Sequence, residues 1–310
     1  MKNDNLMKYL IPIAVFILWG SLYVVAKPAM EHIPPLTLLT LRLSVAAAVI
    51  ALILKKKHGR IQGLKKAHIP RFIAIGTLGY GAGLACLQIS NHLLEASLSS
   101  LLNSLCPIAM IAIAAVVLHE RIDALKIAGI AFAIAGVYII VGIGGSSGSI
   151  SGIVIACVSV LLWSLGSVLI RAVSPDYGPV TTTLYGILFS LPVLTVSSAV
   201  ELAGTPAHFS LTVCLQVLYL GVFATALGNV LWAVALSKAS AGTCSMFYPV
   251  QALTSSIMGI VFLGEAVTQS FVIGAVVISA GILVAVYSDH RSEARLKNGV
   301  FRKPAEITAK

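Results

Sequence analysis

The sequence feature that most constrains the fold is a series of ten continuous apolar stretches, separated by short polar segments. A helix needs about 20 mostly apolar residues to cross the hydrocarbon core of a bilayer. Transmembrane β-strands would instead be shorter and alternate in hydrophobicity, so we expect helices. The predicted spans are residues 9–27, 35–54, 70–90, 96–118, 124–143, 151–171, 180–200, 211–235, 240–263 and 268–287. The sequence therefore predicts an all-α integral membrane protein with ten transmembrane helices.

The composition agrees with this prediction, because 58% of the residues are hydrophobic and only 10% are charged. Soluble domains contain about 25% charged residues, so an ordinary soluble fold is excluded. All five cysteines lie inside apolar stretches, and the sequence has no CxxC motif or Cys/His cluster. We therefore expect neither a metal site nor a disulfide framework, and we expect no cofactor.

The basic residues predict the orientation of the chain in the membrane. If the N-terminus is cytoplasmic, 19 of the 21 Lys and Arg residues fall in cytoplasmic segments, and Lys27 and Arg42 are the exceptions. Cytoplasmic segments of membrane proteins carry an excess of basic residues, so both termini are predicted to be cytoplasmic in a multi-pass protein of the cell membrane. The net charge of +10 then faces anionic lipid of the bilayer, and no nucleic acid is expected as a partner.

The two halves of the chain are related by an internal repeat. Equivalent residues are Trp19 and Trp163 or Lys27 and Arg171 at an offset of 144, and Gly76 and Gly221, Asn103 and Tyr248 or Gly136 and Gly281 at an offset of 145. Each half holds five predicted helices, an odd number, so the halves should have opposite orientations, as in the inverted 5+5 repeats of secondary transporters. The predicted organisation is a first repeat (1–143), an extracytoplasmic Gly/Ser linker (144–150), a second repeat (151–287) and a cytoplasmic tail (288–310).

Polar residues within two spans indicate the walls of a cavity. Tyr248, Gln251 and Ser255 follow at spacings of 3 and 4, so they share one face of the ninth predicted helix. Asn103 in the fourth helix is equivalent to Tyr248. Polar groups in the hydrocarbon should face the bundle interior or a wet cavity. The alternative is that these side chains only hydrogen-bond to neighbouring helices.

Aromatic residues point to the same central region. Trp19 and Trp163 lie near the centres of their predicted helices, outside the interfacial belts where Trp usually collects. Tyr80 lies near the middle of the third helix, and Asn229 and Trp232 lie in the inner part of the eighth. An aromatic pocket suits a flat or apolar solute, or a cation above ring faces. The alternative is that these rings only pack at helix crossings.

Arg42 is the sole basic residue well inside a predicted span, roughly 10 Å from its outer end. A charge at this depth requires a partner or water. Either the outer carboxylates Glu31, Glu95 and Glu265 pair with it, or it contacts an anionic group of a solute. The middle of every predicted span lacks Asp and Glu, which disfavours proton coupling through a membrane-embedded carboxylate.

Several motifs occur in a characteristic order along the chain. They are Leu18-Trp19-Gly20-Ser21, the segment from Pro35 to Arg42, Ala96-Ser97-Leu98-Ser99-Ser100-Leu101 with Pro107 and Leu118-His119-Glu120, and Phe262-Leu263-Gly264-Glu265 with Gly274 and Gly281. In these motifs the chain resembles the ten-helix EamA branch of the drug/metabolite transporter superfamily. The resemblance implies an exporter-like carrier with a central cavity between the halves. Gly186 stands opposite Arg42 and Ala252 opposite Pro107, so charge and helix kink are expected in one half only.

Three functions compete at this point. The repeat and the polar faces favour a secondary transporter, exporter-like, of a small organic metabolite such as an amino acid or nucleoside, working by alternating access. The aromatic residues favour a multidrug or organic-cation exporter, which the lack of an intramembrane carboxylate opposes. An enzyme or lipid-handling scaffold would need clustered acid/base residues. His119, Glu120 and Asp123 are the only candidates, and neighbouring positions on a helix do not converge. We therefore expect no catalytic residues.

Overall fold

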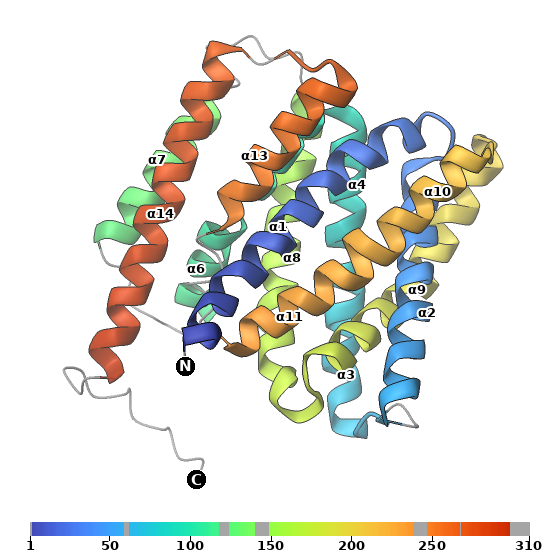
Figure 1. Ribbon diagram of the computed structural model, residues 1–310, viewed down its shortest axis with the longest axis horizontal. Coiled ribbons are helices and arrows are strands. Elements are labelled where there is room, and N and C mark those ends of the chain that lie inside the picture. Colours follow the sequence, from blue (N-terminus) through green and yellow to red (C-terminus); the bar gives the residue numbers. More distant parts are fainter. Residues whose placement is uncertain are drawn as a thin grey trace.

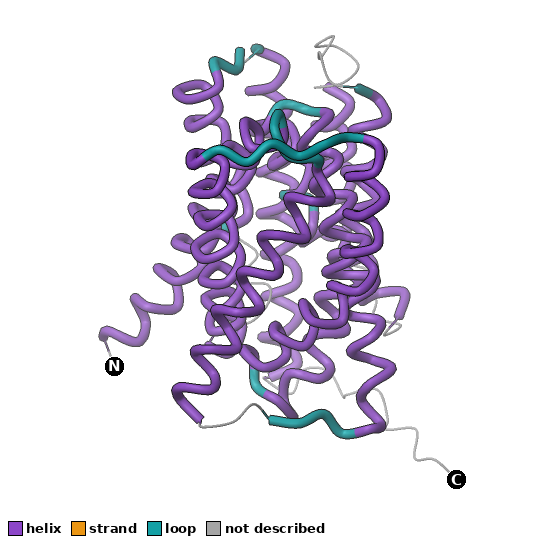
Figure 2. The backbone as a smooth tube through the Cα atoms, turned by 90° about the vertical axis from the view of Figure 1, so that its right-hand side faces the viewer, coloured by secondary structure: helices purple, strands orange, loops and turns teal. Residues whose placement is uncertain are grey.

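The structure is a computed structural model that describes residues 2–58, 62–117, 124–139, 149–238, 247–266 and 268–297. These residues form helices and their connections, and no strand occurs among them. Figures 1 and 2 show the helices packed side by side in one bundle. The helices are α1 (Lys2–Met30), α2 (Pro35–His58), η1 (Lys66–His68), α3 (Ile69–Ala74), η2 (Ile75–Gly83), α4 (Leu84–Leu93), α5 (Ala96–Asn103), α6 (Cys106–Val117), α7 (Ala124–Tyr138), α8 (Ile150–Tyr177), α9 (Pro179–Gly204), α10 (Leu211–Tyr219), η4 (Leu220–Leu227), α11 (Gly228–Lys238), α13 (Tyr248–Met258), η5 (Gly259–Leu263) and α14 (Gln269–Lys297).

Six helical segments of the described chain are long and apolar enough to cross a membrane. They are Leu10–Met30, Pro35–Lys56, Lys66–Leu93, Ile150–Ile170, Pro179–Gly204 and Leu211–Ala235. Four shorter apolar helices accompany them, at Ala96–Met110, Ile127–Tyr138, Tyr248–Leu263 and Gln269–Val284. The prediction of an all-α membrane protein is confirmed.

The end of the last predicted helix differs from the structure. Helix α14 continues to Lys297, so the first part of the predicted tail is helical, where a polar tail after residue 287 was expected. The rest of that tail (298–310) and residues 144–148 of the predicted linker lie outside the described residues.

A proline lies in the first turn of a central helix in both halves. Helix α5 ends at Asn103, and α6 begins at Cys106 with Pro107 in its first turn. Helix α13 begins at Tyr248 with Pro249 in its first turn. Proline lacks a backbone donor and fits the first turn of a helix, where none is needed. The kink expected at Pro107 thus coincides with the boundary between α5 and α6. Residues 239–246 before α13 lie outside the described residues, so the expectation of a kink in one half only stays a prediction.

Contacts at glycines repeat across the two halves. A Cβ atom on Gly136 would lie 2.8 Å from the carbonyl oxygen of Gly274, and one on Gly281 would lie 2.8 Å from that of Gly129. These four residues are two equivalent pairs, so one close contact is made twice. Since residue 129 faces 281 while 136 faces 274, the equivalent helices α7 and α14 run antiparallel. Figure 1 shows them side by side at one edge of the bundle.

A second mirrored contact lies beside the centre of the bundle. A Cβ atom on Gly76 of η2 would lie 3.0 Å from the carbonyl oxygen of Gly186 in α9. The equivalent Cβ atom on Gly221 of η4 would lie 3.1 Å from the carbonyl oxygen of Arg42 in α2. Both segments η2 and η4 are π-helical, a distortion that often marks functional regions of helices. The two repeats therefore share local geometry as well as helix order.

Carboxylates of the second repeat cap helices of the first at one end of the bundle. Glu265 accepts hydrogen bonds from the backbone N–H groups of Ala96 (2.6 Å) and Ser97 (3.1 Å), at the start of α5. Glu201 accepts from the backbone N–H of Thr37 (2.8 Å), at the start of α2. The first N–H groups of a helix lack intrahelical partners and carry a partial positive charge. These caps join the two repeats.

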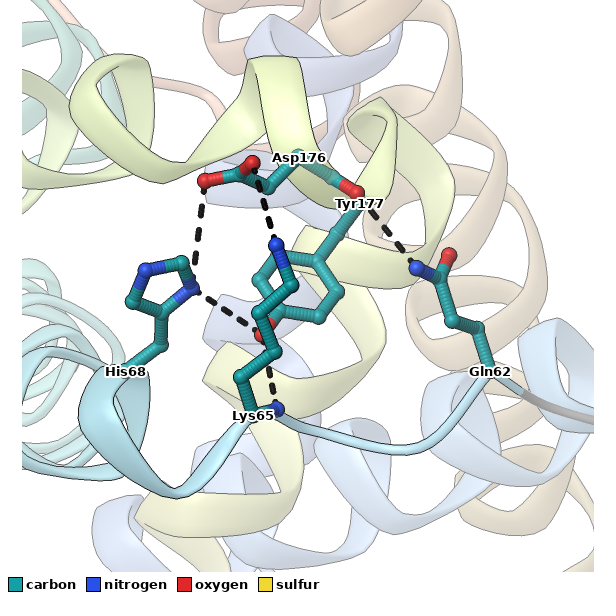
Figure 3. Close-up of polar contacts among 5 residues, drawn as sticks. All are labelled: Gln62, Lys65, His68, Asp176 and Tyr177. Atoms are coloured by element: carbon teal, nitrogen blue, oxygen red, sulfur yellow. Dashed lines mark hydrogen bonds and ion pairs between the residues drawn. The ribbon is translucent and has the colours of Figure 1, made fainter.

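A polar cluster joins the repeats at the opposite end, where the connection from α2 to α3 meets the last turn of α8. We call Gln62, Lys65, His68, Asp176 and Tyr177 the inter-repeat polar cluster (Figure 3). The Tyr177 hydroxyl accepts a hydrogen bond from the backbone N–H of Lys65 (2.9 Å) and lies 3.0 Å from His68 Nδ1. Asp176 lies 3.7 Å from Lys65 Nζ and 3.8 Å from His68 Nδ1. Both ends of the bundle thus carry contacts between the repeats.

Candidate functional site

A cavity lies at the centre of the bundle, between the two repeats. Its lining comes from α1, α2, α4 and α5 of the first repeat and from α8, η4, α11 and α13 of the second. The residues that line it are Trp19, Leu22, Tyr23, Arg42, Leu84, Leu87, Asn103, Ser159, Trp163, Ala224, Thr225, Asn229 and Gln251. About 50 Å³ is open to the centres of water molecules, several times the roughly 10–15 Å³ that one water needs. The site suits a compact solute.

The structure places the predicted site residues in two layers. Trp19, Asn103, Trp163, Asn229 and Gln251 line the cavity, together with Arg42.

The other three predicted residues, Tyr80, Trp232 and Tyr248, are buried behind this layer and are absent from the lining. They support the lining through ring contacts, because Tyr80 lies against Trp163 and Trp232 against Trp19, with ring centroids 5.4 and 5.5 Å apart.

Two of the lining residues, Trp19 and Trp163, belong to one cluster of six aromatic rings. Its members are Phe16, Trp19, Tyr80, Trp163, Trp232 and Tyr248. The equivalent residues Trp19 and Trp163 meet edge to face, with ring centroids 6.5 Å apart. Phe16 contacts Tyr248 and Trp232 at 4.5 and 5.6 Å. Edge-to-face contacts of this kind add about 0.5–1.5 kcal/mol each beyond area burial. The cluster therefore fixes the positions of both tryptophans that border the cavity.

Amide and hydroxyl groups form another part of the lining. Gln251 Nε2 lies 3.3 Å from the Tyr23 hydroxyl and 3.4 Å from Asn103 Oδ1, and so links α13 to α1 and α5. Asn229 Nδ2 donates to the carbonyl oxygen of Thr225 (2.8 Å). These bonds orient two amides whose remaining polar atoms can serve a ligand.

Arg42 is 2% exposed and lines the cavity. Its Nε has no hydrogen-bond partner, and no ion pair within the described part of the chain involves its guanidinium. The predicted pairing with Glu31, Glu95 or Glu265 stays a prediction. Glu265 caps α5, where the backbone N–H groups use its carboxylate oxygens.

Three polar lining residues escaped prediction from the sequence: Tyr23, Ser159 and Thr225. Each stands four residues from a predicted site residue, namely Trp19, Trp163 and Asn229. Residues four apart share one face of a helix, so this spacing could have found them.

The lining is asymmetric about the repeat, because two equivalent pairs exchange large and small side chains. Arg42 is equivalent to Gly186, and Thr225 is equivalent to Tyr80, at offsets of 144 and 145. The Tyr80 ring covers Gly186, where a Cβ atom would lie 2.6 Å from Tyr80 Cε2. One pair of residues therefore consists of Gly186 and the Tyr80 ring. The equivalent pair consists of Arg42 and Thr225.

The residues that an enzyme would require, His119, Glu120 and Asp123, lie outside the described residues.

Comparison with known proteins gives the family of the chain. The model of the EamA-like transporter family matches twice, at residues 6–142 and 150–287. A probable amino-acid metabolite efflux pump of Salmonella typhimurium is 27% identical over 290 residues, which cover 88% of this chain and 92% of that protein. An uncharacterized transporter of Archaeoglobus fulgidus is 26% identical over 273 residues, covering 86% and 94% of the two chains.

A solved crystal structure has the same fold, with a TM-score of 0.66 at 19% sequence identity, and the alignment covers 92% of this chain and 98% of the other. The two family matches meet at the boundary between the repeats and together span most of the sequence. The chain therefore belongs to the EamA-like transporter family.

Proposed function

We propose that this protein is a secondary transporter of a small organic metabolite, such as an amino acid or nucleoside, and that it works in the export direction. The central observation is the buried cavity, to which both repeats contribute a tryptophan at the same repeat position. The probable amino-acid metabolite efflux pump of Salmonella typhimurium among its relatives supports the amino-acid part of this range.

The proposed mechanism is alternating access around this cavity. Six long apolar segments and four shorter apolar helices are consistent with ten membrane crossings, and the basic residues favour cytoplasmic termini. An inverted repeat allows the two halves to exchange conformations, which opens the site to one side and then the other. In this mechanism the caps formed by Glu201 and Glu265 and the inter-repeat polar cluster separate in turn.

An organic-cation exporter is the second candidate, because ring faces can hold a cation. Arg42 opposes this candidate, since a buried positive charge in the lining repels a cationic solute. We therefore favour a neutral, zwitterionic or anionic metabolite.

A transport assay with two cavity variants tests the proposal. The purified protein is screened for ligands by thermal shift against amino acids, nucleosides and organic cations, because a ligand that binds the folded state raises the melting temperature. Counterflow of each hit is then measured in proteoliposomes. Trp163→Ala and Tyr248→Ala should greatly reduce counterflow, because they open the aromatic cluster. Phe262→Ala is the matched control, because its ring is 71% exposed on the bundle surface.

Wild-type counterflow that exceeds that of empty liposomes, together with loss in both cavity variants, supports the proposal. If no compound of the panel binds or is carried, or if both variants carry the hit at the wild-type rate, the proposal is wrong. A reporter that folds only in the cytoplasm, fused after Lys310, tests the proposed orientation of the C-terminus.

A further inference from the structure

We infer that Arg42 and Thr225 form a carboxylate-binding subsite, so that the carried solute is a small carboxylic acid or a zwitterionic amino acid. This inference rests on the proposed transport function and narrows its substrate class. It separates amino acids from nucleosides and organic cations, which lack the carboxylate.

The first argument is the state of the Arg42 guanidinium. It is buried, it lines the cavity, its Nε has no hydrogen-bond partner, and the ion pairs between described residues do not include it. Arginine stays protonated in proteins, so this side chain brings a full positive charge into the bundle. A buried charge without a partner is strongly unfavourable. An anion that enters the cavity supplies the missing partner.

The second argument is an independent orphan on the facing helical segment. Thr225 is buried in the same lining, and its Oγ1 has no hydrogen-bond partner. Gly221, one turn earlier in η4, packs against the backbone of Arg42, so α2 and η4 meet beside the cavity. Buried hydroxyl groups in native proteins are normally satisfied. Two unsatisfied donors on adjoining segments therefore indicate one missing acceptor.

The third argument is the chemistry of the rest of the lining. No other residue of the lining carries a charge, and the remaining polar groups are amides and hydroxyls. The planar fork of a guanidinium matches the two oxygens of a carboxylate. The ring faces of Trp19 and Trp163 and the amides of Asn103 and Gln251 then remain for the apolar part or the ammonium group of the solute.

The asymmetry of the repeat fits this assignment. Gly186 and the Tyr80 ring occupy the positions that are equivalent to Arg42 and Thr225. At the equivalent position, Gly186 is covered by the Tyr80 ring, which fills the space without a charge. A residue that only filled space at position 42 would therefore not need a guanidinium. The guanidinium instead provides a donor on one side of the cavity.

The test uses matched ligands on the wild-type protein and matched variants. The thermal-shift panel contains the standard protein amino acids and short aliphatic monocarboxylates. Each hit is measured again as its amide and as the amine that lacks the carboxylate. We expect hits only among compounds with a carboxylate, and no shift from their amides or amines. This comparison needs no variant, so it holds even if a substitution prevents folding.

The variants assign the effect to the subsite. Arg42→Gln should weaken binding of each carboxylate hit by roughly tenfold or more, and Thr225→Val by roughly two- to tenfold, from the usual strengths of charged and neutral hydrogen bonds. Thr225→Val should leave the melting temperature without ligand unchanged or raised, because it removes an unsatisfied buried hydroxyl. Ser99→Ala is the control, since Ser99 Oγ is also buried and unpartnered but lies outside the cavity lining.

Two results overturn the inference while transport stands: hits confined to nucleosides, amines or inorganic anions such as phosphate, or carboxylate affinity that both variants retain. Absence of any hit, together with absence of counterflow, overturns the proposed function and this inference with it. Loss of carboxylate affinity in Thr225→Val with an intact melting temperature supports the subsite, because a purely structural residue would change both.

Discussion

The cap that Glu265 places on α5 predicts how strongly the two repeats are joined. Its carboxylate holds the N–H groups of Ala96 and Ser97 at 2.6 and 3.1 Å, and both of these residues are buried. Hydrogen bonds to charged groups contribute about 1.5–3 kcal/mol each. Because Glu265 itself is only partly buried, water can replace part of this interaction. We therefore expect Glu265→Ala to lower the free energy of unfolding by about 2–4 kcal/mol.

The amide variant separates the charge from the shape of the cap. In Glu265→Gln the side-chain carbonyl can still accept one bond, while the NH₂ group cannot accept the other, so about 1–2 kcal/mol should be lost. The free energy of unfolding is measured by titration with sodium dodecyl sulfate in mild detergent, followed by tryptophan fluorescence. Glu31→Gln is the control, because Glu31 is exposed. Equal midpoints for Glu265→Ala and the wild type, or an equal loss in Glu31→Gln, would refute this reasoning.

Two further comparisons use the same logic of a change and its matched control. Gly166→Val places a Cβ atom 2.7 Å from the Cα of Gly79 at the crossing of α8 and η2, so about 1–3 kcal/mol of unfolding free energy should be lost. Gly204→Val enters open space and should change it by less than about 0.5 kcal/mol; similar losses in both would contradict the packing argument. Tyr177→Phe removes the acceptor of the Lys65 N–H, so hydrogen exchange at Lys65, measured by mass spectrometry, should rise. Asp176→Asn should leave the exchange rate at Lys65 nearly unchanged, because the ion pair between Lys65 and Asp176 joins exposed side chains. Faster exchange in Asp176→Asn but not in Tyr177→Phe would contradict this prediction.

Long apolar stretches allowed the all-α membrane fold to be predicted, because the hydrocarbon accepts few alternatives. A kink at Pro107 was expected, but the start of α13 at Tyr248, with Pro249 in its first turn, was not. The first residues of α6 and α13 have partners distant in sequence, since Ser164 donates to the carbonyl oxygen of Cys106 (3.2 Å) and Ser104 to that of Tyr248 (3.2 Å). These contacts depend on how the helices pack, and the local sequence does not carry this information.

The types of residue in the site could be predicted from the sequence. Which of them reach the surface of the cavity could be predicted only in part. Aromatic and amide residues near mid-helix were identified, and six predicted residues, including Arg42, line the cavity. Tyr80, Trp232 and Tyr248 support that layer from behind, and their place depends on which ring packs outermost. The sequence left two roles open for Arg42 and could not decide between them, because the carboxylates assigned to it include Glu265, whose oxygens bind backbone groups of α5.

The off-centre position of Arg42 has an electrical consequence. The residue stands seven positions into α2, roughly 10 Å along a helix that crosses a core about 30 Å thick. A solute anion that reaches it therefore crosses roughly a third of the membrane field from one side and two thirds from the other. A full crossing is worth about 2.3 kcal/mol per 100 mV, so these paths differ by about 0.8 kcal/mol per 100 mV. The membrane voltage would then set how far each side of the membrane fills the cavity, even in a carrier with no coupling ion.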